Sequence, residues 1–158
     1  VLLDPRTFAK MLSALEVSNG HLVLDVGAGY GYSSAVIARI AEAVVALEDD
    51  PARVSEAQTL LGDHDADNVI VSAGALTAGI PEHGPYDAMI VEGGVQTLPT
   101  ALTDQLKEGG RIVCLFMDGA LGTVRVGHKF DGRVTWRSLF NAGAPVLAGF
   151  ETQPTFAL

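Results

Sequence analysis

The chain has 158 residues, of which 48% are hydrophobic and 18% charged, and its mean hydropathy is +0.30. This composition is typical of one globular domain and excludes a disordered chain, and no apolar run reaches the roughly 18 residues that a membrane span needs. The net charge of −9, with only ten lysines and arginines, argues against a nucleic-acid groove, because such grooves rely on clustered cations.

The N-terminal region, residues 1–20, is predicted to form a helix. The sequence begins VLLDPRTFAK, without a basic region before its apolar residues, so we expect no signal peptide and a cytoplasmic protein. Because the first residue is Val rather than Met, we also expect that the natural protein extends further upstream. Asp4 is placed to cap a helix over Pro5–Leu15, and Asn19-Gly20 is predicted to end it.

Short apolar strands alternate with amphipathic helices through residues 21–116, which is the pattern of a parallel α/β sheet. The predicted strands are HLVLDV, AVVALE, NVIVS, YDAMIV and RIVCLF, with helices over 32–40, 51–61 and 99–106. The turn KEGG leads into RIVCLF. Within that last strand Cys114, the single cysteine, cannot form an internal disulfide and is expected to be a buried, inert thiol.

The C-terminal part follows a different pattern. LGTVRVGHKF and RVTWRSLFNA alternate with period two and flank Asp131-Gly132, a strong signal for a two-residue hairpin turn. The whole chain, 1–158, is therefore predicted to be one α/β domain with a doubly wound, mostly parallel seven-stranded sheet and an antiparallel hairpin within 120–150. In such a sheet the ligand lies where strand order reverses, here at the carboxyl ends of the first and fourth strands.

A glycine loop follows the first strand in LVLDVGAGYGYS. A dinucleotide-binding loop needs its third glycine three residues after the second, and that position is Tyr32. The glycines instead fall at Gly27, Gly29 and Gly31, with Asp25 two residues ahead. An acid beside the loop would repel a pyrophosphate but suits the ammonium of S-adenosylmethionine, so the pattern favours the methyl donor over NAD.

Glu48 ends the second predicted strand, 21 residues after Gly27. A carboxylate at that place can accept hydrogen bonds from both ribose hydroxyls of an adenosine. The glycine loop alone is weak support for a nucleotide site, but the loop, the two acids and the alternation of strands and helices together are fairly specific.

These segments resemble the protein-L-isoaspartate O-methyltransferases, a family of Rossmann-like S-adenosylmethionine-dependent methyltransferases. The resemblance rests on VLDVGAGYGYSSAVIAR, VVALEDDPARVSEAQ, GPYDAMIVEGG and LKEGGRIV, and extends over residues 1–150. It implies methyl transfer from S-adenosylmethionine to an isoaspartyl carboxylate, the first step in the repair of damaged proteins, in an enzyme that mainly positions its substrate. The cofactor-binding residues that it implies are Asp25, Gly27, Gly29, Gly31 and Glu48, with Gly74, Ala75 and Leu76 beside the adenine. Ala28, Tyr32, Asp49 and Glu92 are predicted to bind the cofactor as well.

Two positions depart from the family pattern. The family has a glycine, acid, glycine triplet after the third strand, whose acid reads the adenine amino group, and here the triplet is Gly74-Ala75-Leu76. Backbone and apolar contacts would then hold adenine, at a loss on the order of 1 kcal/mol. The family also carries a hydroxyl residue two positions before a proline, taken to contact the reacting carboxylate, and Leu3 takes that place. Three alternatives stay open: an isoaspartyl protein or peptide as acceptor, a small molecule as acceptor, or a cofactor-binding domain without catalysis.

Glu92, after YDAMIV, is a weak catalytic candidate that could orient a substrate or act as a base, or only bind the cofactor or cap the next element. Ser33-Ser34 is interpreted as the polar first turn of a helix rather than a nucleophile. GDHDADN at 62–68 lacks the glycine and the final glutamate of a calcium loop and is predicted to be a turn. The four histidines have no ligand spacing, so no metal site is predicted.

Overall fold

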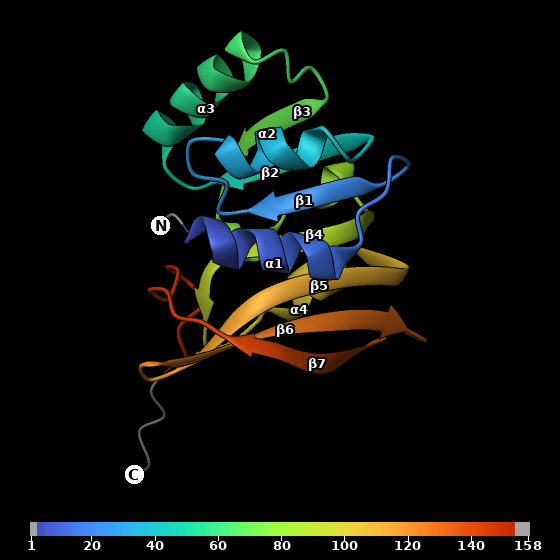
Figure 1. Ribbon diagram of the computed structural model, residues 1–158, viewed down its shortest axis with the longest axis vertical. Helices are drawn as coiled ribbons and strands as arrows, with labels where there is room; N and C mark the ends of the chain where they lie inside the picture. The colour runs from blue at the N-terminus through green and yellow to red at the C-terminus, as the bar shows by residue number, and fades with distance from the viewer. Residues whose placement is uncertain (1–2, 154–158) are drawn as a thin grey trace.

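The computed structural model describes residues 3–153 and has one seven-stranded sheet in the order β3-β2-β1-β4-β5-β6-β7 (Figure 1). The strands are β1 Leu22–Val26, β2 Ala43–Glu48, β3 Val69–Ala73, β4 Tyr86–Val95, β5 Leu106–Asp118, β6 Leu121–Phe130 and β7 Arg133–Asn141. Strands β1 to β5 are parallel and β6 is antiparallel to both of its neighbours, which confirms the predicted sheet. The ends of the predicted domain, 1–2 and 154–158, lie outside the described residues.

Two apolar layers cover the sheet. Figure 1 shows α1 (Pro5–Leu15) and α2 (Tyr32–Ala38) on one face, where Met11, Leu15 and Ile37 pack on strand side chains such as Ile90. The opposite layer holds Leu76 of the short helix η1 (Leu76–Ala78) and Leu102 of α4 (Thr100–Thr103), with Leu147 and Phe150. The remaining helices are α3 (Pro51–Asp63) and η2 (Pro81–His83). Both faces of the central strands are therefore buried, as their continuous apolar sequences predict.

Local signals set several of the element ends. Asp4 Oδ1 accepts a hydrogen bond from the Arg6 amide, and Asp50 Oδ1 accepts one from the Ala52 amide, so both helices after these acids begin at the proline that follows the cap. The first helix ends at Leu15, because Glu16 takes a left-handed conformation with φ 51°. The predicted bounds Pro5–Leu15 are thus confirmed, and the residue that ends the helix is Glu16 rather than Asn19-Gly20, which lies in the turn before β1.

The stretch between β4 and β5 differs from the prediction. The expected helix over 99–106 is the single turn α4, and KEGG is part of β5 rather than a turn before it. Pairing with β4 passes from Tyr86 opposite Leu106 to Ala88 opposite Arg111, so five residues of β5 accompany two of β4. This bulge, in which Gly109 has φ 80°, explains why a glycine-containing segment stays within a strand.

The predicted hairpin region 120–150 is also shorter in the structure. Its turn at Asp131-Gly132 has positive φ at both residues, as expected, but β7 ends at Asn141. Residues 142–153 then return to β4, where the Gly94 amide donates to the Pro145 carbonyl at 2.8 Å and the Leu147 amide donates to the Gly94 carbonyl at 2.9 Å. VEGG accordingly lies inside β4, and its glycines leave room for this returning segment.

Cys114 lies in the centre of the sheet and is fully buried, as predicted, and burial raises the pKa of its thiol. Gly62 and Asp63 of GDHDADN end α3, and the remaining residues 64–68 form the predicted turn to β3. Within residues 3–153, no helix is both long enough and apolar enough to cross a membrane.

Candidate functional site

The carboxyl ends of β1, β2 and β4 meet at one edge of the sheet, where β1 lies between the other two strands. From β1 the chain continues to β2 and β3 on one side, and it then crosses to β4 on the other side of β1. Strand order therefore reverses here, as predicted. A cavity of about 70 Å³ lies at this edge. Its lining comprises Leu3, Gly27, Ala28, Gly29, Tyr30, Tyr32, Ser33, Arg53 and Glu92.

The glycine loop is held against the end of β2. The amides of Gly27 and Ala28 both donate to the Leu47 carbonyl, at 2.9 and 3.1 Å. Gly27, Gly29 and Gly31 all have positive φ, which L side chains rarely adopt. Packing also favours a glycine at Gly31, because a Cβ there would lie 3.3 Å from Ala57 Cβ on α3.

Glu48 joins the loop to the end of β2. Its Oε1 accepts a hydrogen bond from the Gly29 amide at 3.2 Å, and its Oε2 accepts one from the Asp50 amide at 2.8 Å. The residue is 3% exposed. Burial raises the pKa of Glu48, while the hydrogen bond from Asp50 opposes the shift and the neighbouring Asp49 adds to it.

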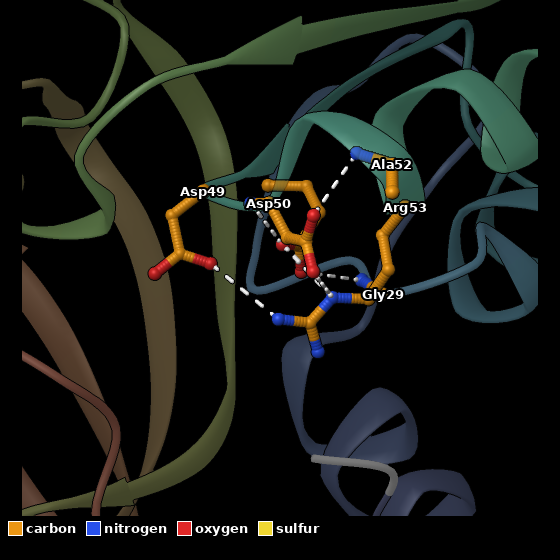
Figure 2. Close-up of polar contacts among 6 residues, drawn as sticks. Gly29, Asp49, Asp50, Ala52 and Arg53 are labelled. Carbon is orange, nitrogen blue, oxygen red and sulfur yellow. Dashed lines mark hydrogen bonds and ion pairs between the residues drawn. The ribbon is translucent and has the colours of Figure 1, made fainter.

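Arg53 provides the positive charge beside Glu48. Its Nε lies 3.4 Å from Glu48 Oε2 and 3.4 Å from Asp50 Oδ2. Figure 2 shows its guanidinium reaching from α3 toward Asp49 and Asp50, with a separation of 3.8 Å to Asp49 Oδ1. Glu48 is therefore positioned by two backbone amides and by one arginine.

Asp25 lies behind the cavity wall rather than in it. Its side chain is fully buried at the end of β1, and Oδ2 accepts hydrogen bonds from the hydroxyls of Ser33 at 2.7 Å and Ser34 at 2.6 Å. The other oxygen, Oδ1, is also buried and has no hydrogen-bond partner within residues 3–153. The two serines thus attach the first turn of α2 to the end of β1.

Glu92 projects into the same cavity from β4 and is 6% exposed. Its Oε2 lies 2.5 Å from Ser33 Oγ, so one hydroxyl contacts both Glu92 and Asp25. Burial first, and the nearby Asp25 carboxylate second, raise the pKa of Glu92 well above its ordinary value.

The predicted triplet, Gly74-Ala75-Leu76, follows β3 and lies beside Glu48. The Gly74 amide donates to the Glu48 carbonyl at 3.1 Å, Ala75 is exposed, and Leu76 is buried near Gly27. The edge of the sheet therefore brings the loop, Glu48, Glu92 and the triplet together, while Gly31 faces α3.

Ser33 and Arg53 contact residues of the site but were not predicted as site residues. Ser33 and Ser34 do form a polar first turn of α2, but Ser33 also contacts Glu92, which the sequence places 59 residues away. Arg53 was not singled out, although the cap at Asp50 places it in the first turn of the helix that follows Glu48. That spacing is the signal by which Arg53 could have been found.

A family model described as Protein-L-isoaspartate(D-aspartate) O-methyltransferase matches residues 2–138. A curated relative from Syntrophobacter fumaroxidans, named Protein-L-isoaspartate O-methyltransferase 1, is 38% identical over 110 residues, which are 70% of this chain and 51% of that relative. The chain thus spans about half the length of this curated relative.

Two solved structures share the fold. A protein-L-isoaspartate O-methyltransferase superposes with a TM-score of 0.85 at 26% identity, covering 92% of this chain and 47% of the other. A putative protein-L-isoaspartate O-methyltransferase from Plasmodium falciparum, in complex with S-adenosyl-L-homocysteine, superposes with a TM-score of 0.80 at 22% identity over 92% of this chain and 75% of the other. Both confirm the predicted methyltransferase fold.

Proposed function

Because the chain belongs to the protein-L-isoaspartate(D-aspartate) O-methyltransferase family, we propose that it binds S-adenosylmethionine and directs its methyl group to an isoaspartyl carboxylate. The observation that carries this proposal is the contact between the Gly29 amide and Glu48, which unites the glycine loop and the strand-end acid in one site. The Plasmodium relative, with S-adenosyl-L-homocysteine bound, lends support at the level of the fold.

The charges of the site fit this cofactor. Its methionyl end carries an ammonium, and the cavity has Glu92 in its wall and Asp25 directly behind Ser33. Neither carboxyl group takes part in an ion pair within the described part of the chain, and Asp25 Oδ1 lacks a hydrogen-bond partner there. A ligand with a cationic end therefore suits the site better than a pyrophosphate.

The two ends of the cofactor would lie on different parts of the edge. A cavity of about 70 Å³ is smaller than the roughly 300 Å³ or more of a pocket that encloses a whole ligand, so it suits the methionyl end alone. Glu48 would accept the ribose hydroxyls, and the exposed Gly74-Ala75 backbone with Leu76 would border adenine.

When bound, the cofactor supplies a methyl group on a sulfonium, which is reactive without further activation. A carboxylate acceptor is ionised at neutral pH, so the residues of the chain need only bind, orient and exclude water. In this proposal the loop, Glu48 and Glu92 hold the donor in a fixed position.

A second candidate is a methyltransferase for an acceptor other than an isoaspartyl carboxylate. The apolar Leu3 and the acidic Glu92 share the cavity and offer an anionic acceptor no positive charge, and Arg53, which also lines it, is paired with the acids at positions 48–50. This observation favours a neutral or cationic acceptor. A further alternative is a domain that binds the cofactor and transfers no methyl group.

One assay separates these functions. The protein is incubated with methyl-labelled S-adenosylmethionine and either an isoaspartyl peptide or the same peptide with ordinary aspartate. Base-labile label in the isoaspartyl peptide alone is the expected result. Label in neither peptide, from a protein that binds S-adenosyl-L-homocysteine, would contradict isoaspartyl transfer by this chain and favour the second candidate.

A further inference from the structure

Ser33 contacts two buried carboxyl groups with one hydroxyl. Its Oγ lies 2.7 Å from Asp25 Oδ2 and 2.5 Å from Glu92 Oε2. A serine hydroxyl has one proton and can donate it to only one of these oxygens at a time. The second contact is favourable only when the other carboxyl group carries a proton and donates it to Ser33. The geometry therefore requires two protons among Asp25, Ser33 and Glu92. One is the hydroxyl proton of Ser33, and the other is carried by one of the two carboxyl groups.

Glu92 is the carboxyl group that holds this proton. Asp25 Oδ2 already accepts two hydroxyl hydrogen bonds, from Ser33 and from Ser34 at 2.6 Å, whereas the Glu92 side chain contacts one hydroxyl, that of Ser33, and the Asp25 carboxyl group within residues 3–153. Burial and the charge of Asp25 both raise the pKa of Glu92, in agreement with this assignment.

Among residues 3–153, no positively charged side chain is paired with Glu92, and the N-terminal amino group, which lowers the pKa of Glu92, is the smallest of the influences on it. From β1 the group that faces Glu92 is Asp25, and from α2 it is Ser33. Arg53 of α3 lines the same cavity, but its ion pairs are with the acids at positions 48–50. From the returning C-terminal segment, Leu147 packs beside Gly93 and is apolar. A proton thus reduces the negative charge of the Asp25–Glu92 pair, and a ligand cation can take the place of that proton.

We infer that Glu92 binds the ammonium of the cofactor's methionyl end and releases its proton to solvent as it does so. This inference rests on the proposed function. No covalent bond of the ligand changes: the neutral carboxyl group loses one proton to the buffer, and the carboxylate that results pairs with the ligand ammonium. Asp25 acts through Ser33 as a positioning residue.

Two consequences follow for binding. Affinity for a ligand with the ammonium rises with pH until Glu92 ionises in the empty protein, because binding releases a proton below that point. Affinity for a ligand with the same adenosine but no ammonium does not depend on this proton. Glu92 therefore selects for the amino-acid end of the cofactor.

Calorimetric titration in pairs of buffers with different ionisation enthalpies measures the protons exchanged per ligand bound. The probes are S-adenosyl-L-homocysteine and 5′-methylthioadenosine, which keeps the adenosine and the thioether but lacks the ammonium and carboxylate. The titrations are repeated between about pH 5 and pH 8 with the wild type, with Glu92→Gln and with Glu56→Gln, an exposed glutamate on α3 that serves as the matched control.

The expected result is a release that approaches about one proton for S-adenosyl-L-homocysteine at the lower pH values and falls at higher pH. Methylthioadenosine should release none, and Glu56→Gln should behave like the wild type. Glu92→Gln should bind methylthioadenosine as before, which reports an intact site, and should bind S-adenosyl-L-homocysteine more weakly and without proton release.

Three results would overturn the inference while leaving the proposed function in place: equal release with both ligands, wild-type release in Glu92→Gln, or binding without release at every pH. If neither ligand binds the wild type, the proposed function itself fails. Because Glu48 also has a raised pKa and contacts the part of the ligand that both probes share, release from Glu48 would be seen with both probes.

Discussion

The Gly29 amide donates a hydrogen bond of 3.2 Å to Glu48 Oε1, and this bond connects the loop after β1 to the last residue of β2. The glycine loop and the acid at the end of β2, the two sequence features that predict an adenosine ligand, are therefore in direct contact. A substitution at Glu48 should affect both the loop and the ligand.

Glu48→Gln is expected to weaken binding of S-adenosyl-L-homocysteine about tenfold, because hydrogen bonds to a charged acceptor contribute roughly 1.5 kcal/mol or more. Calorimetry at neutral pH measures the change, and Glu56→Gln is a control with the same loss of charge at an exposed position. Equal affinity of the two variants would remove Glu48 from the ligand site.

Gly94→Ala is expected to destabilise the protein by about 1 to 3 kcal/mol. A Cβ at Gly94 would lie 2.7 Å from Met117 Cγ and 2.9 Å from the Ala144 carbonyl oxygen, so β4 and the returning segment would have to separate. The midpoint of urea unfolding measures the loss. Gly20→Ala, with no atom within 4 Å of the added Cβ, should change stability by less than about 0.5 kcal/mol. Similar losses in both variants would show that close approach at β4 is not the cause.

Glu92→Gln is expected to make the ligand-free protein more stable than the wild type, by a difference that grows as the pH rises. The pKa of Glu92 is raised above its ordinary value of 4.5, so the folded protein holds this proton more tightly than the unfolded chain. The stability of the wild type is then greatest below the unfolded value and is lost as pH rises through the folded value. The advantage of the variant should grow as the pH rises above 4.5, the ordinary pKa of a glutamate.

Urea unfolding of wild type and Glu92→Gln at several pH values tests this sign. A constant difference between the two proteins across the pH range would show that Glu92 has the same pKa in the folded and unfolded chains. A difference that shrinks with rising pH would contradict the assignment of the proton.

Cys114 is expected to resist a thiol reagent in the folded protein, because it is fully buried and burial raises the pKa of its thiol. Absorbance of the released chromophore should increase only when urea unfolds the chain, with the same midpoint as the loss of ellipticity. A rapid stoichiometric reaction in native buffer would mean that the centre of the sheet opens readily.

The sequence predicts those parts of the fold that have a local cause. Asp4 and Asp50 stand before prolines and cap helices, and Asp131-Gly132 forms the hairpin turn because both residues accept positive φ. The end of the first helix at Leu15 was predicted correctly, but its cause, the left-handed conformation of Glu16, is not one that the residue type predicts.

Features with a nonlocal cause could not be predicted in this way. The return of residues 142–153 depends on space above Gly93 and Gly94, and no pattern within the segment itself points to β4. In the site, the loop and Glu48 were found from their spacing, whereas the link from Ser33 to Glu92 depends on the packing of α2 against the ends of two strands.

In the proposed function, the edge formed by β1, β2 and β4 binds S-adenosylmethionine. Titration of the wild-type chain with S-adenosyl-L-homocysteine in a calorimeter tests it most directly. A dissociation constant in the micromolar range is the predicted result, with binding lost in a variant that combines Asp25→Ala and Glu48→Ala. No heat at millimolar ligand, from a protein that unfolds cooperatively in urea, would contradict the claim.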